Sequence, residues 1–274
     1  VRAFCRPGID RVGILPPTYG MYQVAASIHD AAVARFPLDP ETFQPDLAAL
    51  EPAFGDPRLK LLFLCSPNNP TGTLLRGDLV EQVLERFGGI AVLDEAYIEY
   101  AGDEGWIPQL SRFPKLVVLR TLSKAWGAAG LRVGMAVGHP DVIGLLNRIR
   151  APYNLSTPTQ QAALERIRDR ESTVVQVFQT LAQRGMLAKR LAELPFVERV
   201  FRSDANFLLV RMERPREVFA HLLARGVVVR DRSGEVPGCL RITVGTPEEN
   251  ERLLSELRGF PSDSSTPPSP PPDK

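Results

Sequence analysis

Three short polar segments each follow an apolar run of the kind that forms a buried strand. They are residues 66–72 (SPNNPTG), 94–97 (DEAY) and 121–124 (TLSK). Because open α/β sheets bind ligands at the carboxyl ends of their strands, we expect the three segments to lie around one site. Together they would supply an amide, a carboxylate with a phenol, and a primary amine.

This set of groups suits an aldehyde cofactor that contains a pyridine ring. The amine of Lys124 can form a Schiff base with an aldehyde, and the carboxylate of Asp94 can keep a ring nitrogen protonated, so that the ring accepts electrons. Asn69 and Tyr97 could then hydrogen-bond a phenolate oxygen of the ring. The sequence therefore predicts a catalytic lysine, Lys124, in a cofactor site.

Further residues could hold the rest of such a cofactor. Ser123 and Arg132 could bind a phosphate, the first through its hydroxyl and the second through a charged fork, and Tyr19 offers a flat face on which the ring could stack. Each feature alone has an ordinary structural explanation, since Asn-Pro-Thr-Gly is a favourable turn and Asp94 could cap a helix. The prediction depends on the ordered combination.

The first 160 residues must position these groups, and they alternate between strand and helix patterns. Continuous apolar runs predict buried strands of a mostly parallel sheet, at residues 12–15, 61–65, 90–93, 116–119 and 133–137. Helix patterns lie between or after them, at residues 19–34, 78–87 and 140–150. Repeated strand and helix predict an α/β fold with crossover connections.

The remaining sequence has a different order of predicted helices and strands. One long helical stretch is predicted over residues 160–194, followed by short strands at 197–201, 207–210, 227–230 and 240–244, with helices at 215–225 and 247–257. We therefore expect a large cofactor-binding domain over residues 1–160, a connecting helix region over 161–195, and a smaller α+β domain over 196–260. Residues 261–274, rich in Pro and Ser, are expected to form a disordered tail.

Composition argues against several classes of protein. The 33 basic and 32 acidic residues give a net charge of +1, which is unlike a nucleic-acid binder. The three cysteines lack the spacing of a metal site, and no apolar run is long enough to span a membrane. We expect a cytoplasmic protein that acts on small molecules and has no metal site.

The ordered motifs resemble those of the class I and II aminotransferases, pyridoxal 5′-phosphate enzymes of fold type I. Their pattern is Asn-Pro-x-Gly, then Asp-x-x-Tyr, then Ser-Lys followed by Gly-x-Arg-x-Gly, and this chain matches it at residues 69–72, 94–97, 123–124 and 130–134. Residues 17–22 (PTYGMY), 120–125 (RTLSKA) and 151–156 (APYNLS) are similar to histidinol-phosphate aminotransferases in particular. The resemblance extends to about residue 257. It implies an α/β large domain, a mostly parallel sheet with flanking helices, beside a smaller α+β domain.

The resemblance also implies an activity and two substrate contacts. The enzyme would interconvert histidinol phosphate plus 2-oxoglutarate with imidazole-acetol phosphate plus glutamate, in histidine biosynthesis, with Lys124 holding the cofactor and moving the substrate's α proton. Arg241 would bind the α-carboxylate of glutamate, and Arg230 the phosphate of the substrate. Members of the family act as homodimers with shared sites.

Alternatives stay open at this point. An aromatic aminotransferase and the threonine-phosphate decarboxylase of cobalamin synthesis resemble the same core. An alternative of another class is a catalytically impaired fragment or scaffold. Family members carry a further N-terminal segment, with a glycine-rich turn that binds the cofactor phosphate, and this segment is absent from the sequence. The resemblance therefore implies an N-terminally truncated chain with an incomplete phosphate site.

Overall fold

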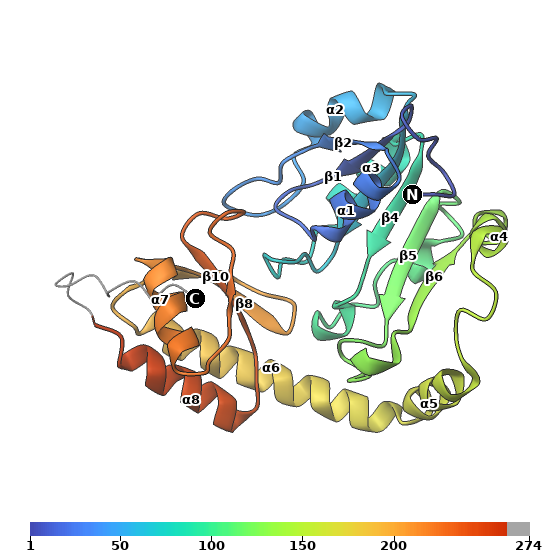
Figure 1. Cartoon of the computed structure of the whole chain (residues 1–274). Helices are drawn as coiled ribbons and strands as arrows, with labels where there is room; N and C mark the ends of the chain where they lie inside the picture. Colours follow the sequence, from blue (N-terminus) through green and yellow to red (C-terminus); the bar gives the residue numbers. More distant parts are fainter. Residues whose placement is uncertain (262–274) are drawn as a thin grey trace, which may run out of the picture.

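The computed structural model describes residues 1–261, and its larger unit is built around a six-stranded sheet (Figure 1). The strands are β1 (Arg11–Ile14), β2 (Ala32–Arg35), β3 (Leu59–Cys65), β4 (Ile90–Asp94), β5 (Leu116–Thr121) and β6 (Gly134–Gly138). They lie in the order β2-β1-β3-β4-β5-β6, and every neighbouring pair is parallel except β5 with β6. All the carboxyl ends of the parallel strands therefore meet at one edge.

Helices connect and cover these strands, as a parallel sheet requires. They are α1 (Met21–Ile28), α2 (Leu47–Gly55), α3 (Gly77–Arg86) and α4 (Pro140–Ile149), with short 3₁₀ turns η1 (Ile98–Tyr100), η2 (Ile107–Gln109) and η3 (Ala129–Leu131). The first turn of α2 is capped by Asp46, whose carboxylate accepts hydrogen bonds from the backbone N–H groups of Ala48 and Ala49.

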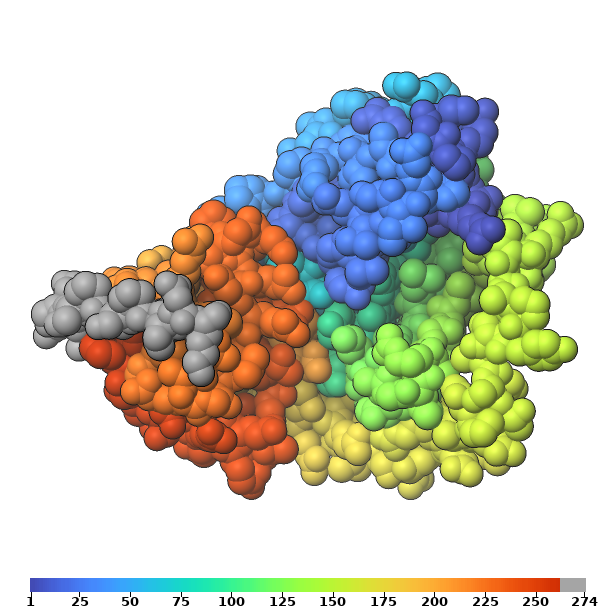
Figure 2. All heavy atoms as spheres, viewed as in Figure 1, coloured from blue at the N-terminus to red at the C-terminus, as the bar shows by residue number. Residues whose placement is uncertain are grey.

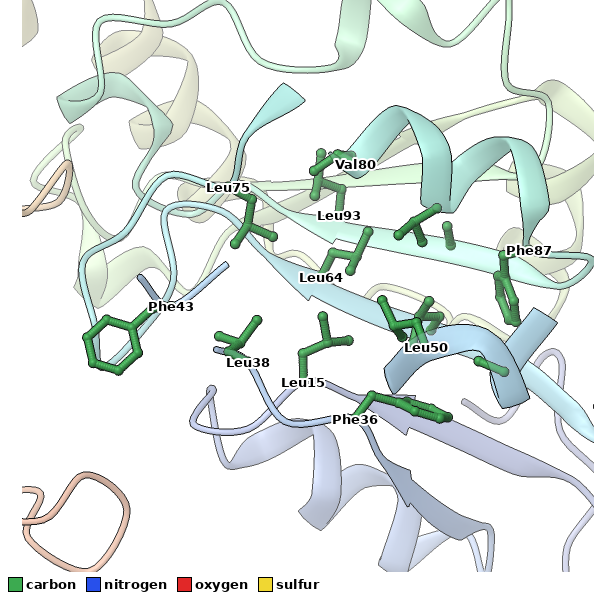
Figure 3. Close-up of a cluster of buried hydrophobic side chains, with 14 of the residues drawn as sticks. Leu15, Phe36, Leu38, Phe43, Leu50, Leu64, Leu75, Val80, Phe87 and Leu93 are labelled. Carbon is green, nitrogen blue, oxygen red and sulfur yellow. The ribbon is translucent and has the colours of Figure 1, made fainter. Parts of the chain in front are cut away.

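The main hydrophobic core lies between the sheet and helices α2 and α3 (Figure 3). Leu64 of β3 and Leu93 of β4 are fully buried there, against Leu50 of α2 and Val80 of α3. Truncation of such a leucine to alanine costs about 2–5 kcal/mol, so this core stabilises the packing of α2 and α3 on β3 and β4. The two strands deliver residues 66–72 and 94–97 to the same edge.

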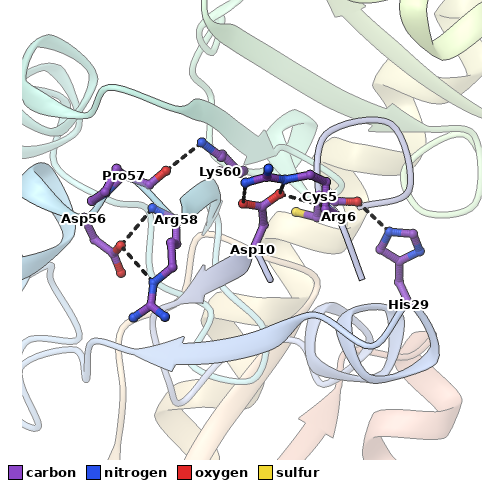
Figure 4. A network of polar contacts seen from close by, with 8 residues as sticks. All are labelled: Cys5, Arg6, Asp10, His29, Asp56, Pro57, Arg58 and Lys60. Atoms are coloured by element: carbon purple, nitrogen blue, oxygen red, sulfur yellow. Dashed lines mark hydrogen bonds and ion pairs between the residues drawn. The ribbon is translucent and has the colours of Figure 1, made fainter. Parts of the chain in front are cut away.

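Polar contacts fix the opposite edge, at the amino ends of β1 and β3 (Figure 4). Arg6 donates two side-chain hydrogen bonds to the carboxylate of Asp10, at 2.9 and 3.0 Å, and Asp56 accepts one from the backbone N–H of Arg58 at 2.9 Å. The ring of His29 bonds the carbonyl oxygen of Cys5 at 2.7 Å. This end of the sheet is thus held by structural ion pairs and turns.

A second sheet contains four antiparallel strands in the order β7-β8-β10-β9. They are β7 (Val197–Val200), β8 (Phe207–Met212), β9 (Arg230–Asp231) and β10 (Cys239–Thr243), with helices α7 (Pro215–Ala224) and α8 (Pro247–Arg258). Helix α8 begins with a complete capping box, in which Thr246 and Glu249 bond each other's backbone N–H groups. This smaller unit has its own core, which includes Leu208, Leu240 and Leu254.

Helices α5 (Thr157–Arg168) and α6 (Arg170–Ala192) connect the two sheets. The space-filling view shows two lobes, with α6 (yellow) visible from the junction along the bottom of the right-hand lobe (Figure 2). Leu187 and Leu191 of α6 lie in the small-sheet core, whereas Leu181 packs beside Tyr97 and Tyr100 of the large unit. The core of the small unit supports our proposal that the chain divides near residues 160 and 195, and Phe201, Leu209 and Cys239 of that unit also join the main core beside the large sheet. Within residues 1–261, no helix has the length and apolar character that a bilayer span needs.

The predicted α/β fold class is confirmed, but three predicted elements are wrong in extent. The helix predicted at 19–34 ends at Ile28, because Asp30 adopts a positive φ of 55° and the following residues form β2. The single helix predicted over 160–194 is interrupted at Asp169, whose ψ of 54° is not helical. The strand predicted at 227–230 is confined to Arg230–Asp231. The backbone N–H of Val227 donates a hydrogen bond to the carbonyl of Leu222 at the end of α7, so this residue belongs to the turn after the helix.

Smaller differences occur elsewhere. The strand predicted at 133–137 begins one residue later and pairs antiparallel with β5, and α2 and β2 were not predicted. The tail predicted for residues 261–274 lies outside the described residues, apart from Pro261.

Candidate active site

A cavity of about 770 Å³ lies at the carboxyl edge of the large sheet, and the small sheet forms one of its walls. All nine side chains predicted to form the site line this cavity: Tyr19, Asn69, Asp94, Tyr97, Ser123, Lys124, Arg132, Arg230 and Arg241. The structure thus brings together residues that are up to 222 positions apart in the sequence, from Tyr19 to Arg241 (241 − 19).

Asp94 ends β4 and turns its carboxylate toward the cavity. The carboxylate accepts a hydrogen bond from the phenol of Tyr22 at 2.7 Å and another from the backbone N–H of Ala96 at 3.1 Å. Burial raises the pKa of Asp94, while these two hydrogen bonds and the positive charge of Lys124 oppose that rise. The carboxylate is therefore poised to meet a cationic partner inside the protein.

Lys124 lies on the turn that follows β5. This turn is held by a hydrogen bond from the backbone N–H of Leu122 to the carbonyl of Val133 (3.1 Å) and by one from Gly127 to Lys124 (3.0 Å). The ammonium group lies 5.1 Å from the centre of the Tyr97 ring and makes no hydrogen bond or ion pair with any of residues 1–261. Burial lowers the pKa of Lys124, and the nearby cation of Arg241 lowers it further. A lysine in this setting is a good nucleophile.

Asn69 is on the 66–72 loop, which the neighbouring Asn68 anchors. The side chain of Asn68, fully buried, donates to the carbonyl of Pro17 at 2.8 Å and accepts from Thr18 at 2.9 Å. These bonds connect the loop of Asn69 to the segment that carries Tyr19. At the end of the loop, Gly72 has a φ of +77° and touches Ser203 so closely that no side chain fits there.

Arg241 of β10 reaches the cavity from the small sheet. One guanidinium nitrogen donates a hydrogen bond of 2.6 Å to the side-chain oxygen of Asn69, and the guanidinium carbon lies 4.9 Å from the centre of the Phe207 ring. Its Nε is buried and has no hydrogen-bond partner in residues 1–261. A buried donor without a partner is costly, so it points to a ligand that accepts a hydrogen bond there.

The other predicted residues occupy the rim of the cavity. Tyr19 is 43% exposed and meets Tyr22 edge-on, with ring centres 5.6 Å apart. Arg132 follows η3 in a left-handed conformation, with a φ of 56°. Arg230 on β9 is also exposed. These side chains are accessible to a ligand that enters the cavity.

Sequence reasoning missed several residues of the site. Tyr22 was quoted in a motif without a role, although its spacing of three from Tyr19 at the start of a helix would place both rings on one side. Asn68 was passed over in favour of its neighbour. Arg120, which lines the cavity and is paired with the buried Glu95 at 2.7 Å, and Arg232, which also lines it, were not identified either.

The donor set fits a phosphorylated pyridine aldehyde. An amine of lowered pKa lies in one cavity with a partly buried carboxylate, and the described part of the chain offers the amine no hydrogen-bond or ion-pair partner. A hydroxyl and a guanidinium, those of Ser123 and Arg132, could bind a phosphate at the rim.

Comparison with known proteins identifies the family of this chain. Residues 1–257 match the family model of the aminotransferases of class I and II. The chain is 46% identical over 263 residues to the histidinol-phosphate aminotransferase of Parabacteroides distasonis, an alignment that covers 95% of this chain and 75% of that protein.

Solved structures agree on the fold. The histidinol-phosphate aminotransferase of Clostridium acetobutylicum superposes with a TM-score of 0.86 at 22% identity, over 92% of this chain and 78% of that one. The corresponding enzyme of Sinorhizobium meliloti, solved in complex with pyridoxal-5′-phosphate, gives 0.85 at 23% identity, over 94% and 73%. At these identities the likeness establishes the fold alone.

Proposed function

The chain belongs to the class I and II aminotransferases, and we propose that it transfers an amino group between histidinol phosphate and 2-oxoglutarate with pyridoxal 5′-phosphate as cofactor. The products would be imidazole-acetol phosphate and glutamate. The observation that carries the proposal is the placement of Lys124 and Asp94 in one cavity, with Asn69 and Tyr97 between the two sheets. The identity of 46% to a histidinol-phosphate aminotransferase, over 95% of this chain, supports this choice of substrate.

Pyridoxal phosphate supplies an electron-accepting ring that stabilises negative charge on the substrate's α carbon. Asp94 would hold a proton on the ring nitrogen, which keeps the ring cationic. The hydrogen bond from Tyr22 orients that carboxylate. Because Asp94 is partly buried, its charge should act more strongly than it would at the surface.

Lys124 would hold the aldehyde group of the cofactor through Nζ, and the same nitrogen would accept and return the substrate's α proton. Its lowered pKa favours the neutral amine that both tasks require. Asn69 and Tyr97 would bind the ring oxygen, Tyr19 would cover the ring, and Ser123 and Arg132 would hold the cofactor phosphate. Arg241, already fixed by Asn69, would bind the α-carboxylate of glutamate.

Initial rates with three amino donors test the substrate assignment. The protein is saturated with pyridoxal phosphate and supplied with 2-oxoglutarate and either histidinol phosphate, phenylalanine or threonine phosphate. We expect the highest kcat/KM with histidinol phosphate. Faster turnover of phenylalanine, or carbon dioxide release from threonine phosphate, would contradict the assignment and favour one of the two related activities.

We also propose that the protein acts as a homodimer. Helices α4, α5 and α6 expose large apolar side chains that a monomer would leave in water: Leu145, Ile149, Leu164, Ile167, Val174, Val175 and Phe178. Sedimentation equilibrium would test this, with a mass of about twice 30.3 kDa expected. The cytoplasmic location stays a prediction.

A further inference from the structure

Three guanidinium groups line the small-sheet wall of the cavity: those of Arg230, Arg232 and Arg241. Arg230 and Arg241 are directly opposite each other in the antiparallel pair of β9 and β10. Arg232 follows two residues after Arg230, and its backbone N–H continues the pairing to Cys239 at 3.0 Å. Because side chains alternate along an extended chain, Arg230 and Arg232 face the same side.

This wall carries more positive charge than its acidic neighbours balance. Like charges opposite each other in a sheet are destabilising, and burial and the charges of Arg232 and Arg230 lower the pKa of Arg241. The acid paired with the cluster is Glu235, which binds Arg232 at 2.9 Å and is itself 42% exposed at its side chain. The intervening Asp231 accepts a hydrogen bond from the backbone N–H of Ser233, and this bond together with the charges of Arg216 and Arg232 lowers the pKa of Asp231.

Unsatisfied polar atoms lie at the same place. The Nε of Arg232 and the hydroxyl oxygen of Ser233 are buried without a hydrogen-bond partner in the described chain, as is the Nε of Arg241. Arg241 is already accounted for by its bond to Asn69 and its proposed carboxylate ligand. Arg232, which lines the cavity, therefore has a donor for a second anionic group, whereas Ser233 is not part of the cavity lining.

We propose that Arg232 binds the phosphate of the phosphorylated amino substrate together with Arg230, and so distinguishes that substrate from amino acids that carry only carboxylates. This inference rests on the proposed function. A phosphate carries nearly two negative charges, so it can neutralise two guanidinium groups where a carboxylate neutralises one. Glu235 would position Arg232 through their ion pair, which closes the turn at residues 232–235. Gly234 and Glu235 of this turn also line a smaller adjacent cavity, together with Tyr19.

The test compares Arg232→Gln with a matched control, Arg225→Gln. Arg225 lies outside the cavity on the same unit and pairs with Glu256 at 3.3 Å, so its loss also removes one guanidinium and one ion pair. Arg232→Gln should raise KM for histidinol phosphate about tenfold, because a charge-assisted hydrogen bond is lost, and leave KM for glutamate nearly unchanged. Arg232→Lys should restore part of the loss, because it keeps the charge without the fork.

Inorganic phosphate provides a readout that does not depend on turnover. Calorimetric titration is made on protein saturated with pyridoxal phosphate and freed of excess, so that Ser123 and Arg132 are already occupied. We expect weaker phosphate binding in Arg232→Gln, unchanged binding in Arg225→Gln, and tighter binding in Glu235→Gln, which removes a competing negative charge.

The inference would be overturned if Arg232→Gln bound phosphate as the parent protein does, if the parent bound none, or if KM for glutamate rose as much as KM for histidinol phosphate. A parent protein that lacked transaminase activity but lost phosphate binding in Arg232→Gln would refute the proposed function and leave this inference standing. Thermal melting of each variant would show whether a loss comes from unfolding.

Discussion

The two walls of the cavity are built in opposite ways. On the large-sheet wall, a carboxylate, an amine and two phenols come from loops and a helix that follow parallel strands. Tyr22 donates a 2.7 Å hydrogen bond to Asp94, and the amine of Lys124 lies 5.1 Å from the centre of the Tyr97 ring. On the small-sheet wall, arginines project directly from paired strands, and several of their donors have no protein partner in residues 1–261.

The difference indicates that the large-sheet wall carries out proton transfer and that the small-sheet wall binds the charged groups of the substrate. Groups that must hold or move a proton need neighbours that set their pKa, which loops at the carboxyl edge can supply from several strands. Groups that recognise charge need only a fixed position and an unpaired donor. We therefore expect changes on the large-sheet wall to affect kcat and changes on the small-sheet wall to affect KM.

The largest effect should come from Lys124→Ala. Without the amine, the substrate's α proton has no nearby acceptor, so kcat should fall about 10⁴-fold or more. Lys115→Ala is the control, since that exposed lysine only caps the carbonyl of Gly88. Steady-state rates with histidinol phosphate measure the effect. A variant that kept its rate would support the non-catalytic scaffold instead.

Arg241→Lys should act mainly on binding. The lysine keeps the charge but cannot bind a carboxylate through two parallel hydrogen bonds or bond Asn69 in the same geometry. We expect KM for glutamate to rise about 10- to 100-fold, with a smaller change in kcat. A fall in kcat at constant KM would break the proposed division between the two walls.

Asp94→Asn should lower activity but stabilise the protein without cofactor. Because burial raises the pKa of Asp94, the ionised carboxylate destabilises the folded protein. The free energy of unfolding therefore falls as the pH rises from the ordinary pKa of aspartate through the raised value, whereas asparagine has no charge to bury. At neutral pH we expect the free energy of unfolding to increase by roughly 0.5–2 kcal/mol, and the gain to vanish below the ordinary pKa of aspartate. Urea unfolding at several pH values measures it, with Glu85→Gln as an exposed control.

Tyr22→Phe should have the smallest effect. The ring still stacks on Phe63, 4.6 Å away, but the hydrogen bond that favours ionised Asp94 is lost. The pKa of Asp94 should rise further, so the acidic limb of the pH profile should move to higher pH, with a loss of a few-fold in kcat at neutral pH. An unchanged acidic limb would mean that Tyr22 only packs.

The proximity of the site residues could be predicted from the sequence because of one topological rule. Polar segments that follow parallel strands meet at one edge, so the order of residues 66–72, 94–97 and 121–124 was sufficient to place Asn69, Asp94 and Lys124 together. The roles of the nine residues stay proposals.

Contacts between distant segments were not predictable in this way. Tyr22 reaches Asp94 across 72 positions only because α1 begins at Met21 and turns its first buried side chain, that of Tyr22, toward the end of β4. Arg232 was overlooked because the strand was predicted to end at residue 230. The helix break at Asp169 and the strand β2 depend on backbone angles that local propensity does not encode.

One measurement tests the central claim most directly. Pyridoxal phosphate is added to the purified protein, borohydride reduces any bond between the aldehyde and an amine, and peptide mass spectrometry locates the label. The account predicts label on the peptide that contains Lys124 and not on Lys60, Lys115, Lys189 or Lys274. Label on another lysine, or none at all, would contradict it.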